Sequence, residues 1–182
     1  MQNDIKQRIS ESKRAFLNLV WPVISTWLGG GELVPMEGID AEFARKLDIY
    51  SGIDAWQFVG DHVRGLASRV QVRPTEYEDN RYPYNTFTIR HERRSGVKTE
   101  YQKRQEAVNS GEYIFPDIMA QAYLEMWYGP LLTVATAKTK DILDCIAKGH
   151  ADYKWTHEGD SRFVYCSWAD MRQNDYHIKI YP

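Results

Sequence analysis

The chain has 182 residues, of which 43% are hydrophobic and 26% are charged, and its formal net charge at pH 7 is -2. This length and composition suit one globular domain with its own core, and they exclude a disordered or fibrous chain. A net charge so close to zero excludes recruitment of nucleic acid by the overall field, so a phosphate-binding surface would have to be a local patch.

The N-terminal residues and the cysteines indicate the cellular compartment of the protein. After Met1, residues Gln2, Asn3 and Asp4 are polar or acidic where a signal peptide would be basic and then apolar. No apolar run reaches the roughly 20 residues that cross a bilayer. Cys145 and Cys166 are too few for a disulfide framework and have no metal-binding spacing, so we expect buried thiols in a reducing compartment. We therefore expect a cytoplasmic protein with no membrane partner.

The N-terminal part is predicted to be helical. Apolar residues recur at helical spacing from Ile5 to Leu28, which predicts a long amphipathic helix with a kink near Pro22. The triglycine 29–31 ends this helix, because glycine adopts the left-handed conformation of a helix stop. The segment 40–50 predicts a second, short helix.

Three short runs of β-branched and aromatic residues then predict three strands, at 52–59, 66–72 and 86–91. A polar segment between the last two is interpreted as a hairpin loop. A helix is predicted at 98–109, where Thr99 and Gln102 form a capping box.

The remaining segments predict more strands and a covering helix. Strands are expected at 117–127, 131–136 and 162–168, and the tail 176–181 is a further candidate. The helix between them has Thr139 as its N-cap and Gly149 just past its end. The sequence thus predicts one α/β (α+β) domain over 1–182, with a mixed central sheet flanked by helices: a helical part (1–50), the core sheet with its helix (51–137), and a covering helix with C-terminal strands (138–182).

Asp54 is an unusual residue for its position. It lies in the first predicted strand, in Gly52-Ile53-Asp54-Ala55-Trp56, among residues typical of a buried strand. A carboxylate there needs a hydrogen bond, an ion pair or a cation. One interpretation is a structural acid satisfied by backbone or arginine, and the other is a metal ligand.

The next strand offers partners for a metal site. Gln71 and Arg73 lie on the same face because side chains alternate along a strand. If the two strands form a hairpin, Asp54 would meet Gln71 and Arg73 at one end of the sheet. Oxygen ligands for a hard cation would then lie beside a positive charge for phosphate, which predicts a phosphodiester site.

With Asp54 on one strand and Gln71-Val72-Arg73 on the next, the layout from about Ile5 to Thr136 resembles the PD-(D/E)XK nuclease superfamily, whose core order is αβββαβ. The resemblance implies a catalytic site in which Asp54 binds Mg²⁺ or Mn²⁺, Gln71 takes the second ligand position and Arg73 takes the position of the lysine. Arginine cannot act as a base, although it can hold a phosphate. Asp48 is a candidate for a missing carboxylate ligand, and Glu42 and Glu32 are alternatives, although these two are more typical of solvated surface acids.

A basic stretch follows the third predicted strand. Its cations lie on a strand end, a loop and a helix start, where they are suited to contact a phosphate backbone. Because Glu92, Glu100 and Glu106 are interspersed, a solvated loop is the alternative interpretation. The candidate nucleic-acid contacts are Arg90, Arg93, Arg94, Lys98, Lys103 and Arg104.

The aromatic residues and the absence of several motifs reduce the number of candidate functions. The chain has 6 Trp and 12 Tyr, and residues such as Trp155 and Trp168 can stack on bases, although such residues more often fill a core or an interface. The histidines lack zinc spacing, and neither a phosphate-binding glycine loop nor a nucleophile elbow is present. Zinc enzymes, nucleotide-binding enzymes and acyl transferases are therefore disfavoured.

Three hypotheses follow. The first is a metal-dependent endonuclease that cleaves phosphodiester bonds in DNA or RNA. The second is a catalytically degenerate nuclease-fold binding protein, such as an anti-CRISPR-like inhibitor from a phage or mobile element, whose partner is a protein or RNA of a host nucleic-acid-targeting complex. The third is a structural subunit, in which Asp54 and Arg73 form a buried ion pair and the aromatic residues form a homo-oligomer interface.

Overall fold

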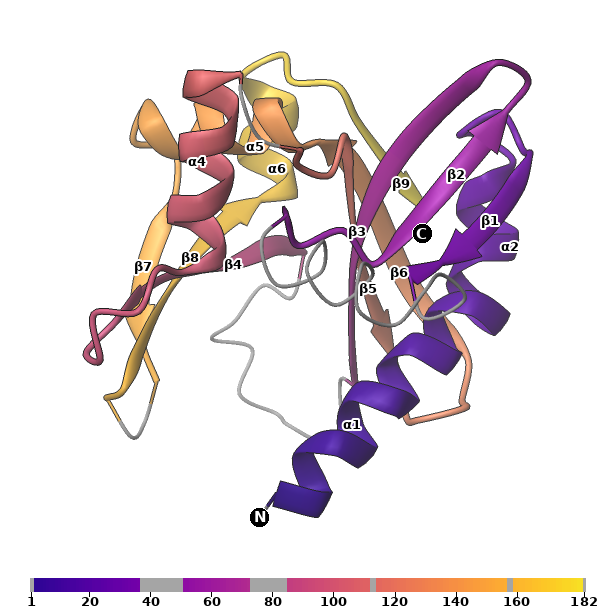
Figure 1. Ribbon diagram of the computed structural model, residues 1–182, viewed down its shortest axis with the longest axis horizontal. Coiled ribbons are helices and arrows are strands. Elements are labelled where there is room, and N and C mark those ends of the chain that lie inside the picture. Colours follow the sequence, from indigo (N-terminus) through magenta and orange to yellow (C-terminus); the bar gives the residue numbers. More distant parts are fainter. Residues whose placement is uncertain (1, 37–50, 73–84, 112–113, 157–158, 182) are drawn as a thin grey trace.

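The computed structural model describes residues 2–36, 51–72, 85–111, 114–156 and 159–181. The helix expected at 40–50, and with it Asp48, lies outside the described residues, as does Arg73. The described chain has an α+β fold with a mixed six-stranded sheet and an antiparallel three-stranded sheet (Figure 1). The mixed central sheet predicted from the sequence is thereby confirmed.

The larger sheet has the strand order β1-β2-β3-β5-β6-β9. β3 and β5 are parallel, and every other neighbouring pair is antiparallel. A parallel pair requires a long crossover, which the segment containing β4 and α4 provides. The strands are β1 (Glu32–Pro35), β2 (Ala55–Val59), β3 (His62–Val72), β5 (Ile118–Leu124), β6 (Leu131–Lys138) and β9 (Ile178–Tyr181).

The smaller sheet has the order β4-β8-β7 and lies to one side of the larger one in Figure 1. The predicted hairpin between the second and third strands is wrong, because β3 and β4 belong to different sheets. β4 instead pairs with β8, where Ile89 lies opposite Val164 and both are fully buried. The strands are β4 (Thr86–Arg93), β7 (Asp152–Trp155) and β8 (Ser161–Ser167).

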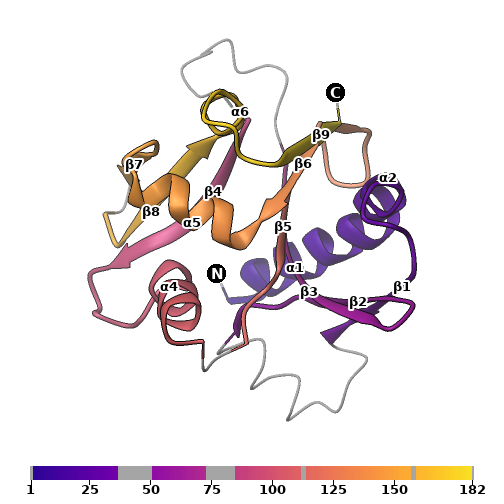
Figure 2. The same cartoon turned by 90° about the horizontal axis from the view of Figure 1, so that it is seen from above.

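The predicted N-terminal helix is confirmed and covers one face of the larger sheet (Figure 2). It consists of α1 (Gln2–Ala15), a π-helical turn η1 (Phe16–Val20) and α2 (Trp21–Ser25). Pro22 lies in the first turn of α2, where its missing amide hydrogen is tolerated, and the π-turn directly before it is the helix irregularity. Phe16, Val20 and Ile24 pack on Leu66 and Val70 of β3.

The second core lies on the opposite face of that sheet. There the Trp168 ring packs against both Phe87 of β4 and Tyr123 of β5. Both cysteines are buried free thiols in this core, as predicted. The covering helices are α4 (Glu100–Ser110), α5 (Thr139–Ala147) and α6 (Trp168–Gln173).

Two helix starts test the predicted caps. The capping box of Thr99 and Gln102 is present at α4. Thr139 as the N-cap of α5 is wrong, because Lys138 holds that position and makes no side-chain cap bond. Among the described residues, no helix is long and apolar enough to cross a membrane.

Candidate anion-binding site

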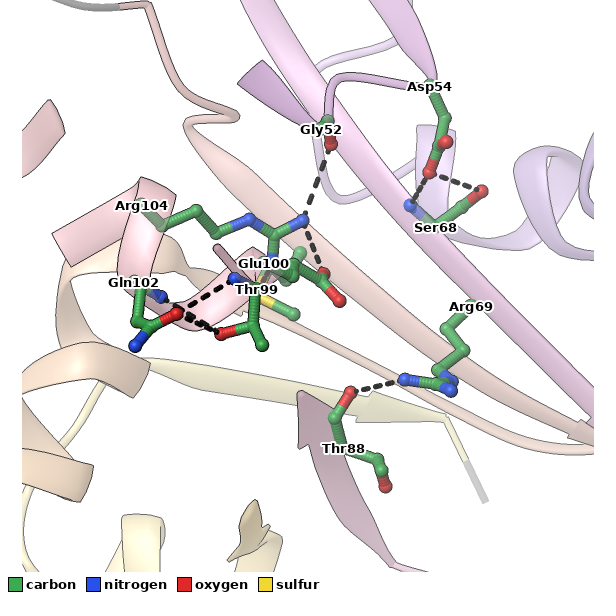
Figure 3. Close-up of polar contacts among 10 residues, drawn as sticks. Gly52, Asp54, Ser68, Arg69, Thr88, Thr99, Glu100, Gln102 and Arg104 are labelled. Carbon is green, nitrogen blue, oxygen red and sulfur yellow. Dashed lines mark hydrogen bonds and ion pairs between the residues drawn. The ribbon is translucent and has the colours of Figure 1, made fainter. Parts of the chain in front are cut away.

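A pocket of about 300 Å³ lies where the larger sheet meets β4, β8 and α4. Its wall combines carboxylate and guanidinium groups, some of which Figure 3 shows. Arginines from three different elements therefore share one small space. The lining residues are Gly52, Asp54, Ala67, Ser68, Arg69, Thr88, Arg90, Glu100, Arg104, Met119, Ala120 and Phe163.

Asp54 is held by the backbone of the neighbouring strand. Its own amide donates to the Leu66 carbonyl oxygen at 2.8 Å. Its Oδ2 accepts a hydrogen bond from the Ser68 amide nitrogen at 2.6 Å and one from Ser68 Oγ at 3.3 Å (Figure 3). The interpretation of Asp54 as an acid satisfied by backbone therefore fits the structure, and its carboxylate still lines the pocket.

The register of the hairpin decides which residues lie beside Asp54. The predicted pairing of the first two strands is confirmed, with Val59 opposite His62 and Ala55 opposite Leu66. Asp54 therefore lies beside Ala67 and Ser68. Gln71 lies about 10 Å further along β3 than Ser68, at roughly 3.3 Å per residue.

The expected meeting of Asp54 and Gln71 is thus not observed. The Gln71 side-chain oxygen instead accepts a hydrogen bond from Gln121 Nε2 of β5 at 3.3 Å. The tight turn that joins β2 to β3 is the physical reason, because it sets a pairing that brings the middle of β3, not its end, to Asp54. Arg73 and Asp48 lie outside the described residues, so their positions relative to Asp54 are not defined.

Arg69 and Arg90 approach the pocket from different sheets. Arg69, on β3, donates from Nη1 to the Thr88 carbonyl oxygen of β4 at 2.9 Å and so ties the two sheets together (Figure 3). The Cζ atoms of Arg69 and Arg90 each lie 5.2 Å from the centre of the Phe163 ring. The phenyl ring is therefore a shared platform for two cations.

The electrostatics of Arg90 reflect this crowding. Burial lowers the pKa of Arg90, and the charges of Arg93 and Arg69 lower it further. An arginine nevertheless remains charged in proteins. The Arg90 Nε atom is buried and has no hydrogen-bond partner among the described residues. An anion in the pocket would relieve the repulsion between the guanidinium groups.

Arg104 differs from the expected exposed contact for nucleic acid. Its side chain is 3% exposed, and Nη2 lies 2.7 Å from Glu100 Oε1. The same guanidinium donates to the Gly52 carbonyl oxygen at 3.3 Å (Figure 3). It also donates to the sulfur of Met119 at 3.0 Å. Arg104 therefore forms the pocket wall, and Glu100 neutralises its charge.

The other predicted cations remain on the surface. Arg94 and Lys98 are exposed, while Arg93 and Lys103 are half-buried. Lys98 forms an ion pair with Glu106 at 2.6 Å. Arg94 lies over the Trp155 ring, with Cζ 5.5 Å from the ring centre. Apart from Arg90 and Arg104, the predicted cations therefore lie outside the residues that line the pocket.

The part of the chain that the structure describes contains no group of three or more His, Cys, Asp or Glu placed to hold a metal ion. Among the described residues that line the pocket, the carboxylates are those of Asp54 and Glu100, and Glu100 is already paired with Arg104. The oxygen ligands expected for Mg²⁺ are thus not gathered by the described residues.

Sequence reasoning missed Arg69 and Phe163. Arg69 had a usable signal, because strand alternation places it on the same face as Gln71 and two residues nearer to the hairpin turn. Phe163 had none, since it reaches the pocket through the pairing of β8 with β4. Comparison with protein-family models, curated proteins and solved structures gives no significant match, so no relative assigns a role to this pocket.

Proposed function

We propose that this chain is a catalytically degenerate, nuclease-like protein that binds the phosphate backbone of nucleic acid without cleaving it. The observation that carries the proposal is the convergence of Arg69 and Arg90 on Phe163. Neither guanidinium forms an ion pair with a carboxylate among the described residues. Two cations held together in this way favour an anionic ligand.

Phosphate suits these groups chemically. A guanidinium presents a planar fork of donors that matches two oxygens of one phosphate. Arg69 uses one of its N–H groups to bind the Thr88 carbonyl oxygen, and its other N–H groups remain for a ligand, beside the guanidinium group of Arg90 in the same pocket wall. The pocket volume of about 300 Å³ admits a phosphodiester group with part of its sugar.

The residues beside Asp54 support binding over catalysis. The resemblance to PD-(D/E)XK nucleases requires a second acid and a lysine near the first acid. The observed register instead puts Ala67 and Arg69 there, two residues apart on β3. Alanine offers no metal ligand and arginine no base. Neither of these two residues of β3 supplies a metal ligand or a base for hydrolysis beside Asp54, which favours binding over cleavage.

Binding assays test the proposal. Fluorescence anisotropy with labelled DNA and RNA oligonucleotides would compare the wild type with Arg69→Ala and Arg90→Ala at several salt concentrations. Arg172→Ala is the matched control, because Arg172 is an exposed arginine on α6 outside the pocket. Each pocket variant should bind roughly tenfold more weakly and show a smaller salt dependence. Unchanged binding in both pocket variants would contradict the proposal.

A cleavage assay separates binding from hydrolysis. The same oligonucleotides would be incubated with Mg²⁺, Mn²⁺ or EDTA, with wild type and Asp54→Ala. We expect intact substrate in every reaction. Metal-dependent cutting that Asp54→Ala abolishes would show instead that the chain is an endonuclease.

A further inference from the structure

One face of the smaller sheet carries a row in which arginines and aromatic rings alternate. Trp155 of β7 lies opposite Arg162 of β8, and directly paired residues share a face. Arg94 Cζ lies 5.5 Å from the Trp155 ring centre, and Arg162 Cζ lies 4.7 Å from that of Tyr153. These four residues are called the aromatic–arginine row: Arg94, Trp155, Arg162 and Tyr153.

The inner end of the row is fixed to the core. Tyr153 meets His91 edge-on at 4.9 Å, and His91 in turn lies 4.7 Å from the Tyr101 ring of α4. Tyr101 belongs to the second core and is buried. Both aromatic residues of the row are partly exposed, at 38% for Tyr153 and 39% for Trp155. The row therefore places partly exposed rings and arginines together on a sheet that is packed against the core.

We propose that the row binds unpaired bases, so that the nucleic acid bound by this protein is single-stranded. This inference rests on the proposed function and adds the class of ligand to it. Exposed rings offer a stacking surface that accepts any base, and neighbouring arginines can contact the phosphates between the bases. In a duplex the bases are stacked and paired, so they cannot reach these rings.

The charges of the row fit a polyanion. Arg162 Nη1 lies 3.8 Å from Glu92 Oε2, so most of the N–H donors of the Arg162 guanidinium remain available. The Asp160 carboxylate accepts a hydrogen bond from Thr156 at 2.7 Å. Arg94 forms no ion pair with a carboxylate in the described part of the chain. At least one cation of the row is thus available for a phosphate.

The row also continues from the pocket. Arg90 of the pocket and Arg94 of the row lie on the same stretch of chain, and Arg94 directly follows the last residue of β4. At about 3.3 Å per residue, they are roughly 13 Å apart along the chain. The register pairs Arg90 with Phe163 and Glu92 with Arg162. Because Arg162 and Phe163 are consecutive in β8, their side chains point to opposite faces of the sheet. The pocket therefore lies on one face and most of the row on the other. A flexible single strand can follow this path over the end of the sheet, whereas a rigid duplex cannot.

The test uses the full chain with two labelled probes of equal length, a thymidine oligonucleotide and a mixed-sequence duplex. Trp155→Ala removes the outermost ring and Trp155→Phe keeps a ring. Tyr128→Ala is the control, since Tyr128 is an exposed tyrosine outside the row. Thermal unfolding of each variant confirms that it is folded.

We expect the wild type to prefer the single strand. Trp155→Ala should weaken single-strand binding by roughly 5- to 100-fold, and Trp155→Phe should restore most of it. Equal binding of both probes by the wild type, or unchanged single-strand binding in Trp155→Ala, would overturn the inference. The proposed function would survive either result if Arg90→Ala still weakened binding, whereas absence of binding to any probe would overturn both.

Discussion

Asp54 and Ser68 are joined across the β2–β3 hairpin by two hydrogen bonds to one carboxylate oxygen, at 2.6 Å from the Ser68 amide nitrogen and 3.3 Å from its hydroxyl. Asp54→Ala removes this acceptor, and losing a hydrogen bond to a charged group should lower the free energy of unfolding by about 1–3 kcal/mol. Asp54→Asn keeps one oxygen and should lose less. Urea unfolding curves, whose midpoint and slope give the free energy of unfolding of each variant, measure these losses.

The opposite outcome has a specific meaning. If Asp54 were present mainly to bind a metal ion, its carboxylate would destabilise the metal-free fold. Asp54→Ala would then be as stable as the wild type, or more stable, in buffer without metal. A less stable Asp54→Ala that also retains nucleic-acid binding would identify Asp54 as a structural residue of the pocket wall.

Local patterns in the sequence were sufficient for most of the elements. Hydrophobic periodicity predicted the helix before the triglycine, and the capping box at Thr99 predicted the start of α4. The strands that became β2, β3, β5 and β6 were predicted because each is a short apolar run between turn residues. β1 and β7 were missed, since each is only four residues long and neither is fully buried.

The candidate site depends on information that local patterns do not contain. Gln71 was predicted to meet Asp54, but a shift of a few residues in register brings Ala67 to it instead. Likewise, nothing near β4 in the sequence specifies that β8 is its partner, although this pairing brings Phe163 to Arg90. The sequence therefore identified Asp54 and Arg90 as residues of interest, and the long-range pairings determined their surroundings.

The contacts of the buried Arg104, which include an ion pair with the partly exposed Glu100, should be important for stability. Arg104 is almost fully buried and also contacts Gly52 and Met119, so its removal leaves several partners unsatisfied. Arg104→Ala should lower the free energy of unfolding by about 1–3 kcal/mol, the cost of leaving buried hydrogen-bonding groups unsatisfied, because the partly exposed Glu100 can be solvated by water. Chemical denaturation measures this loss. The exposed Arg172→Ala should change stability by less than about 0.5 kcal/mol, and an equal loss in both variants would contradict a special role for Arg104.

The triglycine provides a matched pair of substitutions. Gly30 and Gly31 both have positive φ angles, of 69° and 85°. A Cβ atom on Gly31 would lie 2.1 Å from the Phe58 carbonyl oxygen, whereas one on Gly30 would meet nothing within 4 Å. Gly30→Ala should cost about 1–2 kcal/mol for the left-handed backbone alone. Gly31→Ala should cost clearly more, because the clash with backbone cannot be relieved by a side-chain movement.

Thermal unfolding of the two glycine variants side by side checks this difference. Equal melting temperatures would show that the chain at Gly31 can move away from β2. In that case the destabilisation of both variants would come only from the positive φ angle.

His91 should make stability depend on pH. Burial lowers the pKa of His91, the charge of Arg162 lowers it further, and Glu92 opposes the shift. The rings of Tyr101 and Tyr153 enclose the same imidazole. Because the folded-state pKa lies below the unfolded value of about 6.5, the unfolded chain binds the proton more readily. The stabilising contribution is therefore present above about pH 6.5 and is lost as the pH falls through the lower folded-state pKa.

His91→Phe isolates this contribution, since phenylalanine keeps a ring between the two tyrosines and does not titrate. We expect the difference in free energy of unfolding between wild type and His91→Phe to shift in favour of the variant as the pH is lowered from 7.5 to 5.5. Urea titrations at each pH measure it, and the other histidines cancel because both proteins contain them. A difference that stayed constant, or moved in favour of the wild type at low pH, would show that protonated His91 is accepted in the folded state, for example through Glu92.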